Sequence, residues 1–193
     1  MSSGAHVVSG VAAVDLPEAV GRSEWLFFHA AIYGNFAKNP AMLAALDTVL
    51  SRPGGCLEVI SLDAQAPLCW RDEFFAVLRE DVFPGDMAVL CRESDVFLAD
   101  LADRYPGRVR RYASRTLPLA PIIITDDRIF AGQYLHGPVP APHGLWMIVP
   151  APVRRLRRLA EAGMPPDPRD RDEAAAYRLV RECVAAREAA RPI

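Results

Sequence analysis

A strand, a helix and a second strand follow one another between residues 24 and 62, and this unit constrains the fold more than any other part of the chain. Glu24 to Ile32 is a run of large apolar residues, typical of a central strand buried on both faces. Asn39 and Pro40 provide a helix N-cap and a first-turn proline, and apolar residues then recur at helical spacing as far as Gly54-Gly55. Cys56 to Leu62 is the second strand. Because such crossovers connect parallel strands, the sequence predicts an α/β fold.

The remaining patterns extend this unit into a mixed β-sheet flanked by helices. In the first part of the chain they predict an edge strand within residues 6–14, helices marked by Trp70 to Leu78 and Asp86 to Leu101, and a strand from Arg108 to Ala113. In the second part they predict short strands at Ile122–Thr125, Ile129–Tyr134 and Leu145–Val149, then helices at Pro152–Ala162 and Asp170–Ala190. Ser94 could divide the helix that begins at Asp86. We expect one domain over residues 1–193, with a core at about 24–150 and C-terminal helices at about 152–190.

Composition narrows the class of protein. The chain has 193 residues, of which 51% are hydrophobic and 24% charged, as in an ordinary globular domain. Its net charge of −2 argues against a dominant nucleic-acid-binding surface but leaves room for a local basic patch. The four cysteines show no C-x-x-C spacing, so we expect buried thiols. With no apolar run of about 20 residues and no signal peptide, the sequence predicts a cytoplasmic protein without a membrane segment.

The stretch from Thr116 to Val149 carries the pattern of a known motif. The apolar run Ile122-Ile123-Ile124 leads to Asp126, and Gly132-Gln133 follows one short strand later. This order resembles the phospholipase D superfamily, whose motif is His-x-Lys-x-x-x-x-Asp, then an apolar strand and a Gly-Ser-x-Asn turn. Asp126 falls on the motif Asp and Gly132-Gln133 on the Gly-Ser.

The catalytic residue types of that motif are missing. Counting back from Asp126 places the motif His at Leu119 and the motif Lys at Pro121. In the superfamily the His is the nucleophile and the Lys binds phosphate, so the resemblance implies that the usual phosphodiester chemistry is absent. The resemblance covers roughly residues 24 to 149 and implies a single phospholipase-D-like half with a C-terminal helical extension.

Polar residues follow several predicted strands, at the edge where open α/β sheets bind ligands. The candidate catalytic residues, which combine imidazoles with carboxylates suited to general acid–base work, are His29, Asp63, Asp126, His136 and His143. The candidate ligand-binding residues are Tyr33, Asn35, Arg115, Gln133, Tyr134 and His136. The alternative for each is a hydrogen-bonded core or loop side chain. For Asp126-Asp127 the alternative is a turn.

Arginines form two basic runs: Arg108, Arg110, Arg111 and Arg115, then Arg154, Arg155, Arg157 and Arg158. Guanidinium groups bind phosphate and carboxylate, so these runs allow a small anionic ligand or a nucleic acid. The alternative is a solvated face, with Glu161, Asp170 and Asp172 as ion-pair partners. Scattered histidines and the absence of a Gly-rich phosphate loop lead us to expect no metal and no cofactor.

These patterns favour a non-catalytic phospholipase-D-like domain that acts as a ligand-sensing or protein-interaction module. One alternative is a hydrolase or phosphodiesterase with relocated catalytic residues, which requires at least two of the candidates to converge. A weaker alternative is nucleic-acid binding through the arginines. Because the superfamily builds its cleft from two halves, we expect a homodimer, with residues 132–143 at or near the contact and Leu145 and Trp146 just beyond.

Overall fold

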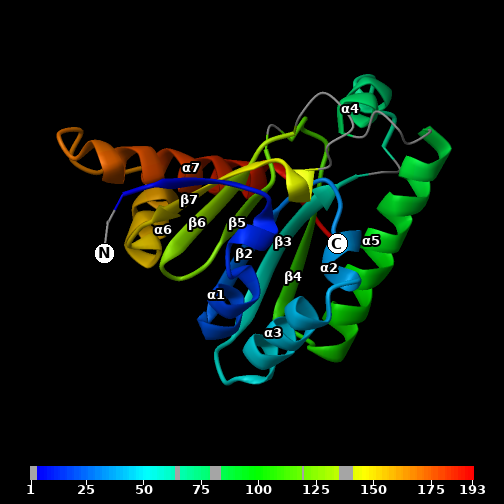
Figure 1. Cartoon of the computed structure of the whole chain (residues 1–193), viewed down its shortest axis with the longest axis horizontal. Helices are drawn as coiled ribbons and strands as arrows, with labels where there is room; N and C mark the ends of the chain where they lie inside the picture. The colour runs from blue at the N-terminus through cyan, green and yellow to red at the C-terminus, as the bar shows by residue number, and fades with distance from the viewer. Residues whose placement is uncertain (1–3, 64–65, 79–83, 119, 135–140) are drawn as a thin grey trace.

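A mixed β-sheet forms the centre of the computed structural model, which describes residues 4–63, 66–78, 84–118, 120–134 and 141–193 (Figure 1). Its strands are β1 (His6–Ser9), β2 (Trp25–His29), β3 (Cys56–Leu62), β4 (Val109–Ser114), β5 (Ile122–Ile124), β6 (Arg128–Gly132), β7 (Leu145–Pro150) and β8 (Arg191–Pro192). Among the described residues these eight strands lie in the order β1-β7-β6-β5-β2-β3-β4-β8.

Helices connect and cover these strands. They are α1 (Leu16–Arg22), α2 (Gly34–Ala37), α3 (Pro40–Ser51), α4 (Arg71–Leu78), α5 (Pro84–Arg104), α6 (Val153–Glu161) and α7 (Arg171–Ala189), with short 3₁₀ turns η1 (Val11–Ala13) and η2 (Ala141–His143). The predicted α/β fold, with a mixed sheet flanked by helices and a helical C-terminal extension, is confirmed.

The predicted strand–helix–strand unit forms the parallel half of the sheet. β2 pairs with β3, and β3 with β4, all parallel. The strand β2 ends at His29, three residues earlier than predicted, where the next ladder contact, from the Ala30 amide to the Ile60 carbonyl, is weakened to 3.4 Å and a side chain binds both groups. The Tyr33 hydroxyl donates to the Ile60 carbonyl at 2.6 Å and accepts from the Ala30 amide at 2.8 Å. The backbone therefore leaves the sheet and turns into α2.

The predicted ends of α3 are confirmed. Asn39 accepts a hydrogen bond from the Met42 amide at 3.2 Å, and Pro40 occupies the first turn. After the helix, Gly54 has a φ of 84°, a conformation that favours glycine. A Cβ on Gly55 would lie 1.9 Å from the Val49 carbonyl oxygen, so only glycine fits there. The glycine pair thus turns the chain directly from α3 into β3.

The other half of the sheet is antiparallel. β5, β6 and β7 form a meander, β1 pairs with β7 at one edge, and β5 joins the meander to β2. Asp126-Asp127 forms the predicted turn, closed by the Thr125 amide donating to the Arg128 carbonyl at 2.9 Å. Gly132 permits a close approach of two ring side chains to the backbone of β6. A Cβ there would lie 2.8 Å from the Pro121 ring and 2.9 Å from the Trp146 ring.

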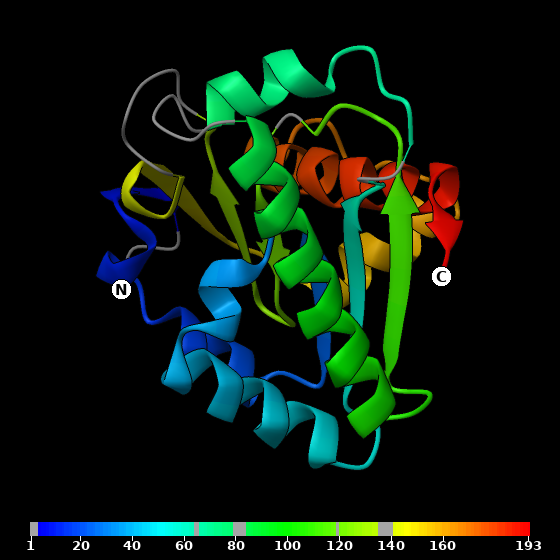
Figure 2. The same ribbon diagram turned by 90° about the vertical axis from the view of Figure 1, so that its right-hand side faces the viewer.

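The two faces of the sheet carry separate hydrophobic clusters. One packs under α1, α3 and α5 and includes Phe28, Leu46 and Leu98. The other packs under α6 and α7 and includes Phe27 and Val180. Figures 1 and 2 show α5 on one side of the parallel strands and α7 on the other. Alternate residues of β2 thus point into different cores, which explains its unbroken apolar run.

Several local features differ from the sequence-based predictions. α1 and β8 were not predicted, because an apolar pattern over about two helical turns and a two-residue strand give little periodic signal. Ser94 does not divide α5. It is buried within the continuous helix, and its hydroxyl accepts from the Tyr33 amide at 2.7 Å.

The prediction that the cysteines are buried thiols is correct for two of the four. All four cysteines are free thiols, but only Cys91 and Cys183 are buried, while Cys56 is half-buried and Cys69 is exposed. Among the helices that the structure describes, none has the length and hydrophobicity of a membrane span.

A buried carboxylate joins α6 and α7 to the sheet. Glu58 on β3 is 2% exposed and accepts hydrogen bonds from the Trp25 indole at 2.9 Å, Arg157 at 2.9 Å and Arg187 at 3.0 Å. Arg157 also lies over the Trp25 ring, 4.3 Å from its centroid, and both arginines bind Glu161. Burial alone would raise the pKa of Glu58, but the Trp25 hydrogen bond and the two guanidinium groups outweigh it and hold the pKa below its ordinary value.

Glu58→Gln should destabilise the fold. It leaves Arg157 and Arg187 without their buried counter-charge, although both keep Glu161, and removing one partner of a fully buried ion pair costs about 3–5 kcal/mol. Arg157 and Arg187 keep some contact with water, so we expect about 2–3 kcal/mol in urea unfolding. The control is Glu93→Gln, which removes a pair with Lys38 whose side chains are 46% and 68% exposed. It should change the unfolding free energy by less than about 1 kcal/mol.

The same two proteins give a pH test. The folded pKa of Glu58 lies below its unfolded value, so the charged carboxylate contributes stability above the unfolded pKa, and that contribution is lost as the pH falls through the folded pKa. The difference in unfolding free energy between wild type and Glu58→Gln should therefore shrink on acidification below the ordinary glutamate pKa of 4.5. A difference that stays constant through this range would contradict the role assigned to Glu58.

Candidate functional site

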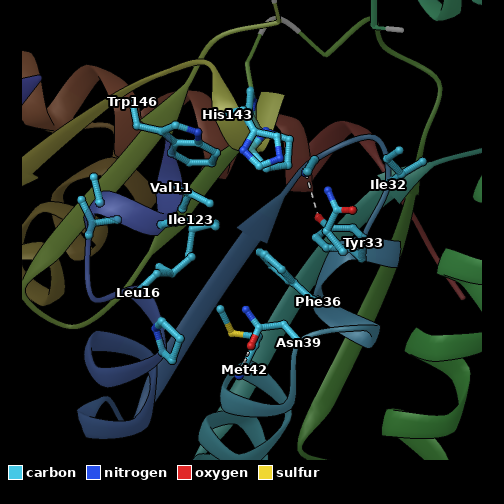
Figure 3. A pocket seen from close by; sticks show the side chains of 18 of the residues that line it. Val11, Leu16, Ile32, Tyr33, Phe36, Asn39, Met42, Ile123, His143 and Trp146 are labelled. Atoms are coloured by element: carbon cyan, nitrogen blue, oxygen red, sulfur yellow. Dashed lines mark hydrogen bonds between the residues drawn. The ribbon is translucent and has the colours of Figure 1, made fainter. Parts of the chain in front are cut away.

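A pocket of about 860 Å³ lies beyond the carboxyl end of β2, on the face covered by α1 and α3. Its walls come from three parts of the chain (Figure 3). The lining residues are Val11 to Pro17; Ala30, Ile32, Tyr33, Asn35, Phe36, Asn39 and Met42; and Leu78, Pro121, Ile123, Tyr134, Pro142, His143 and Trp146. The lining is mainly apolar, with a few polar groups, as in small-molecule sites generally.

Two tyrosines anchor the loop that forms one wall. The Tyr33 hydroxyl is used by Ala30 and Ile60, and the Tyr134 hydroxyl accepts from the Ala31 amide at 3.1 Å. Burial raises the pKa of both phenols well above the ordinary value. Neither hydroxyl is available for acid–base chemistry at neutral pH, so Tyr33 and Tyr134 contribute to the pocket lining through their aromatic rings.

His29 is a core histidine in this fold. It is the last residue of β2 and pairs in register with Ile60 and Ile122, which belong to the cluster under α6 and α7. It therefore lies on the opposite face of the sheet from the pocket. Burial lowers the pKa of His29 to about 4, and its Nδ1 has no hydrogen-bond partner among the described residues. The imidazole is neutral at physiological pH.

The two candidate aspartates follow interior strands of the sheet and lie at opposite ends of those strands. Asp63 follows β3 and accepts from the Arg115 Nε at 3.1 Å. Asp126 follows β5, near the start of β2, where it accepts from the Glu24 amide at 2.7 Å and from Arg154 at 3.0 and 3.1 Å. Both carboxylates have structural partners, and neither lines the pocket.

The structure brings together only part of the predicted site. Tyr33, Asn35, Tyr134 and His143 line the pocket, whereas Arg115 and Gln133 do not. The predicted roles of His136 and of Leu119 concern positions outside the described residues. None of His29, Asp63 and Asp126 lines the pocket, and the two aspartates are paired with Arg115 and Arg154, so the three do not form the convergent group in the pocket that a relocated active site requires.

One wall of the pocket was missed in the sequence. Val11 to Pro17 contributes seven lining residues, yet this segment has weak periodicity. Asp15 caps α1 by accepting from the Glu18 amide at 3.1 Å, with Pro17 in the first turn. Asp15-Leu-Pro-Glu18 is a recognisable helix start, and this signal could have located α1.

The charge of the lining is low. Among the described lining residues, Asp15 is the only carboxylate and no lysine or arginine is present. The predicted small anionic ligand therefore has no guanidinium partner here. No three His, Cys, Asp or Glu side chains within the described ranges cluster closely enough to hold a metal ion.

Most of the two arginine runs is committed to internal contacts. Arg111 pairs with Asp95, Arg115 with Asp63, Arg154 with Asp126, Arg155 with Glu173 and Arg157 with Glu58, while Arg108 donates to the Arg52 carbonyl. Glu161 serves as a partner, as predicted, whereas the partner of Arg155 is Glu173 and not Asp170 or Asp172. Within the described part of the chain, only Arg110 and Arg158 of these runs form no side-chain hydrogen bond or ion pair.

Comparison with known proteins gives a fold likeness. No protein-family model matches the chain, and no curated protein matches it. Among solved structures, the chain is similar to TrmBL2, an archaeal chromatin protein whose structure shows a novel mode of DNA binding. The TM-score is 0.50 at 12% sequence identity, over 98% of this chain and 54% of the TrmBL2 chain. This chain thus spans about half the length of TrmBL2, and the two share a fold.

Tyr33→Phe should destabilise the protein by about 1–3 kcal/mol, because it removes the short hydrogen bonds of the buried Ile60 carbonyl and the Ala30 amide and leaves these two groups only their 3.4 Å contact with each other. Urea unfolding measures this change. Tyr177→Phe is the matched control, since Tyr177 is half-buried on α7 and its hydroxyl has no partner among the described residues. Equal effects of the two substitutions would show that the Tyr33 hydroxyl does not hold the loop.

Proposed function

We propose that this chain is a non-catalytic domain that binds a small molecule in the pocket beyond β2 and acts as a ligand-sensing or protein-interaction module. The observation that carries the proposal is the pocket itself, about 860 Å³ with a mainly apolar lining. This volume lies in the range of small-molecule sites. The lining joins the N-terminal segment, the β2–α2 loop and β7, so a bound ligand contacts three separate parts of the fold.

The resemblance to the phospholipase D superfamily stays a prediction, and the pocket is compatible with its loss of catalysis. Pro121, at the position of the motif lysine, lines the pocket with an apolar ring. Asp126, at the position of the motif Asp, is bound by Arg154 near the start of β2, at the opposite end of that strand from the pocket. The alternative of a hydrolase with relocated residues has little support, because His29 and Asp63 are not among the lining residues.

Binding of an uncharged apolar fluorophore tests the proposal. We expect phenylnaphthylamine to bind the wild-type protein with a blue-shifted, enhanced emission. Ala13→Trp should weaken that binding at least about tenfold, or about 1.4 kcal/mol, because the exposed Ala13 lies at the pocket and an indole there occupies ligand space. Ala44→Trp, on the exposed side of α3 and away from the pocket, is the control. Unchanged binding in Ala13→Trp, or no binding by wild type, would remove the proposal.

Nucleic-acid binding is the second candidate, favoured by the likeness to TrmBL2. In this chain most arginines of the two runs already have internal partners, and Arg110 and Arg158 are the exposed exceptions. If DNA binds through these two side chains, log K should fall with log salt with a slope of only about 2. Fluorescence anisotropy of a labelled duplex, with Arg110→Ala/Arg158→Ala as the variant, measures this. No binding at low salt would exclude the candidate.

The homodimer also stays a proposal. Leu135 and Val139, predicted near the contact, lie outside the described residues. Trp146 is buried in the pocket wall and does not offer a contact surface. Leu145 is 47% exposed, and Val7 on the neighbouring edge strand β1 is 63% exposed. An open edge strand with apolar side chains supports pairing of sheets at this edge.

A further inference from the structure

We infer that the pocket takes an uncharged, largely aromatic molecule that carries a hydrogen-bond acceptor, such as a carbonyl oxygen, at one end. This inference rests on the proposed function and adds the class of ligand. It follows from three properties of the lining: its low charge, its aromatic rings, and the side-chain amide of Asn39, whose oxygen is already hydrogen-bonded.

The lining disfavours anions. No lysine or arginine is present among its described residues. Two of the helices that begin at the pocket, α1 and α3, each have a first-turn amide that is already capped: the Glu18 amide donates to Asp15 at 3.1 Å, and the Met42 amide donates to Asn39 at 3.2 Å. Each helix also has a proline in its first turn, which lacks an N–H. A carboxylate or phosphate entering the pocket would lose its hydration without gaining enough donors, and Asp15 would repel it.

A cation gains little from the same surroundings. Asp15 is exposed, so its attraction is weakened by water. The amino-terminal ends of α1 and α3 carry partial positive charge toward the pocket, which offsets part of the Asp15 charge. The electrostatic balance therefore favours an uncharged ligand.

Rings form much of the wall. The hydroxyls of Tyr33 and Tyr134 are hydrogen-bonded to the backbone, which leaves their ring surfaces toward the pocket. Phe36 packs 6.0 Å from the Tyr33 ring and is half-buried. In Figure 3 Trp146 and His143 lie together at one end of the pocket, with Phe36 between them and Asn39. Flat aromatic ligands match such surfaces, because offset and edge-on ring contacts add to the burial of apolar area.

We place the polar end of the ligand at Asn39, which lies with Met42 at the end away from Trp146 (Figure 3) and which, unlike Asn35, the other carboxamide of the described lining, is oriented by a hydrogen bond. Its Oδ1 accepts from the Met42 amide, so its Nδ2 is the atom left to interact with a ligand. That group donates only, and it therefore requires an acceptor such as a ketone or amide oxygen.

Three naphthalene compounds test the inference: Prodan, an uncharged ketone; naphthoate, an anion; and phenylnaphthylamine, which is uncharged and lacks a carbonyl. We expect wild type to bind Prodan at least about tenfold more tightly than naphthoate. Asn39→Asp keeps the oxygen that caps α3 and removes the donor, and Asn39→Ser keeps a capping oxygen without adding charge, on a shorter side chain whose hydroxyl does not reach the position of Nδ2. Both should weaken Prodan binding by about three- to tenfold and leave phenylnaphthylamine binding within about twofold.

The outcomes separate this inference from the proposed function. Naphthoate binding as tightly as Prodan would overturn the uncharged class. Prodan binding that is insensitive to both Asn39 substitutions would overturn the acceptor end, provided that urea unfolding shows both variants folded. In either case retained phenylnaphthylamine binding, weakened by Ala13→Trp, leaves the proposed function standing. Failure of wild type to bind any of the three removes both.

Discussion

One buried carboxylate determines how the two layers of this fold are joined. Glu58 lies in the central strand β3, where a lone charge would be strongly unfavourable. Trp25 from the neighbouring strand, Arg157 from α6 and Arg187 from α7 all bind it. Because each partner comes from a different element, satisfying this one charge sets the positions of both C-terminal helices on the sheet. The apolar cluster beneath α6 and α7 stabilises their packing on the sheet, and the ion pairs with Glu58 fix where along the sheet the two helices lie.

On the opposite face of the sheet, the tyrosine hydroxyls near the pocket are bound to the protein backbone and are not directed into the pocket. Tyr33 binds the backbone of β2 and β3 through its hydroxyl and Ser94 of α5 through its amide. Tyr134 binds the same loop. The loop that leaves β2 is thus tied to the sheet, to α5 and to the segment after β6. A pocket wall built in this way is held by several hydrogen bonds and presents mainly carbon to the pocket.

The sequence predicts the elements with long, strongly patterned signals. β2, α3 and β3 were located because apolar runs, an N-cap and a glycine pair agree with one another. The candidate site was predicted only in part. His29 follows the rule that ligands bind at strand carboxyl ends, but that rule does not say which face of the sheet holds the pocket, and the side-chain alternation of β2 directs His29 into the other core. Asp126 was a candidate catalytic residue because the sequence alone does not distinguish an aspartate that forms a turn from one that takes part in catalysis. Its partners, Glu24 and Arg154, are far away in the chain and cannot be read from local pattern.

The contact between Glu58 and Arg187 spans 129 residues of chain, and this has a consequence for synthesis. During translation the strands β2 and β3 leave the ribosome long before α7 exists. Until then Glu58 is a carboxylate without its guanidinium partners, on a sheet face whose apolar side chains are still bare. The apolar cluster on that face therefore stays incomplete until α7 has been synthesised and packs on the sheet. Contacts of such sequence separation slow folding, because a long loop must be ordered before they form. For this chain the window between the emergence of β3 and the docking of α7 is the period of greatest exposure to aggregation and to chaperones.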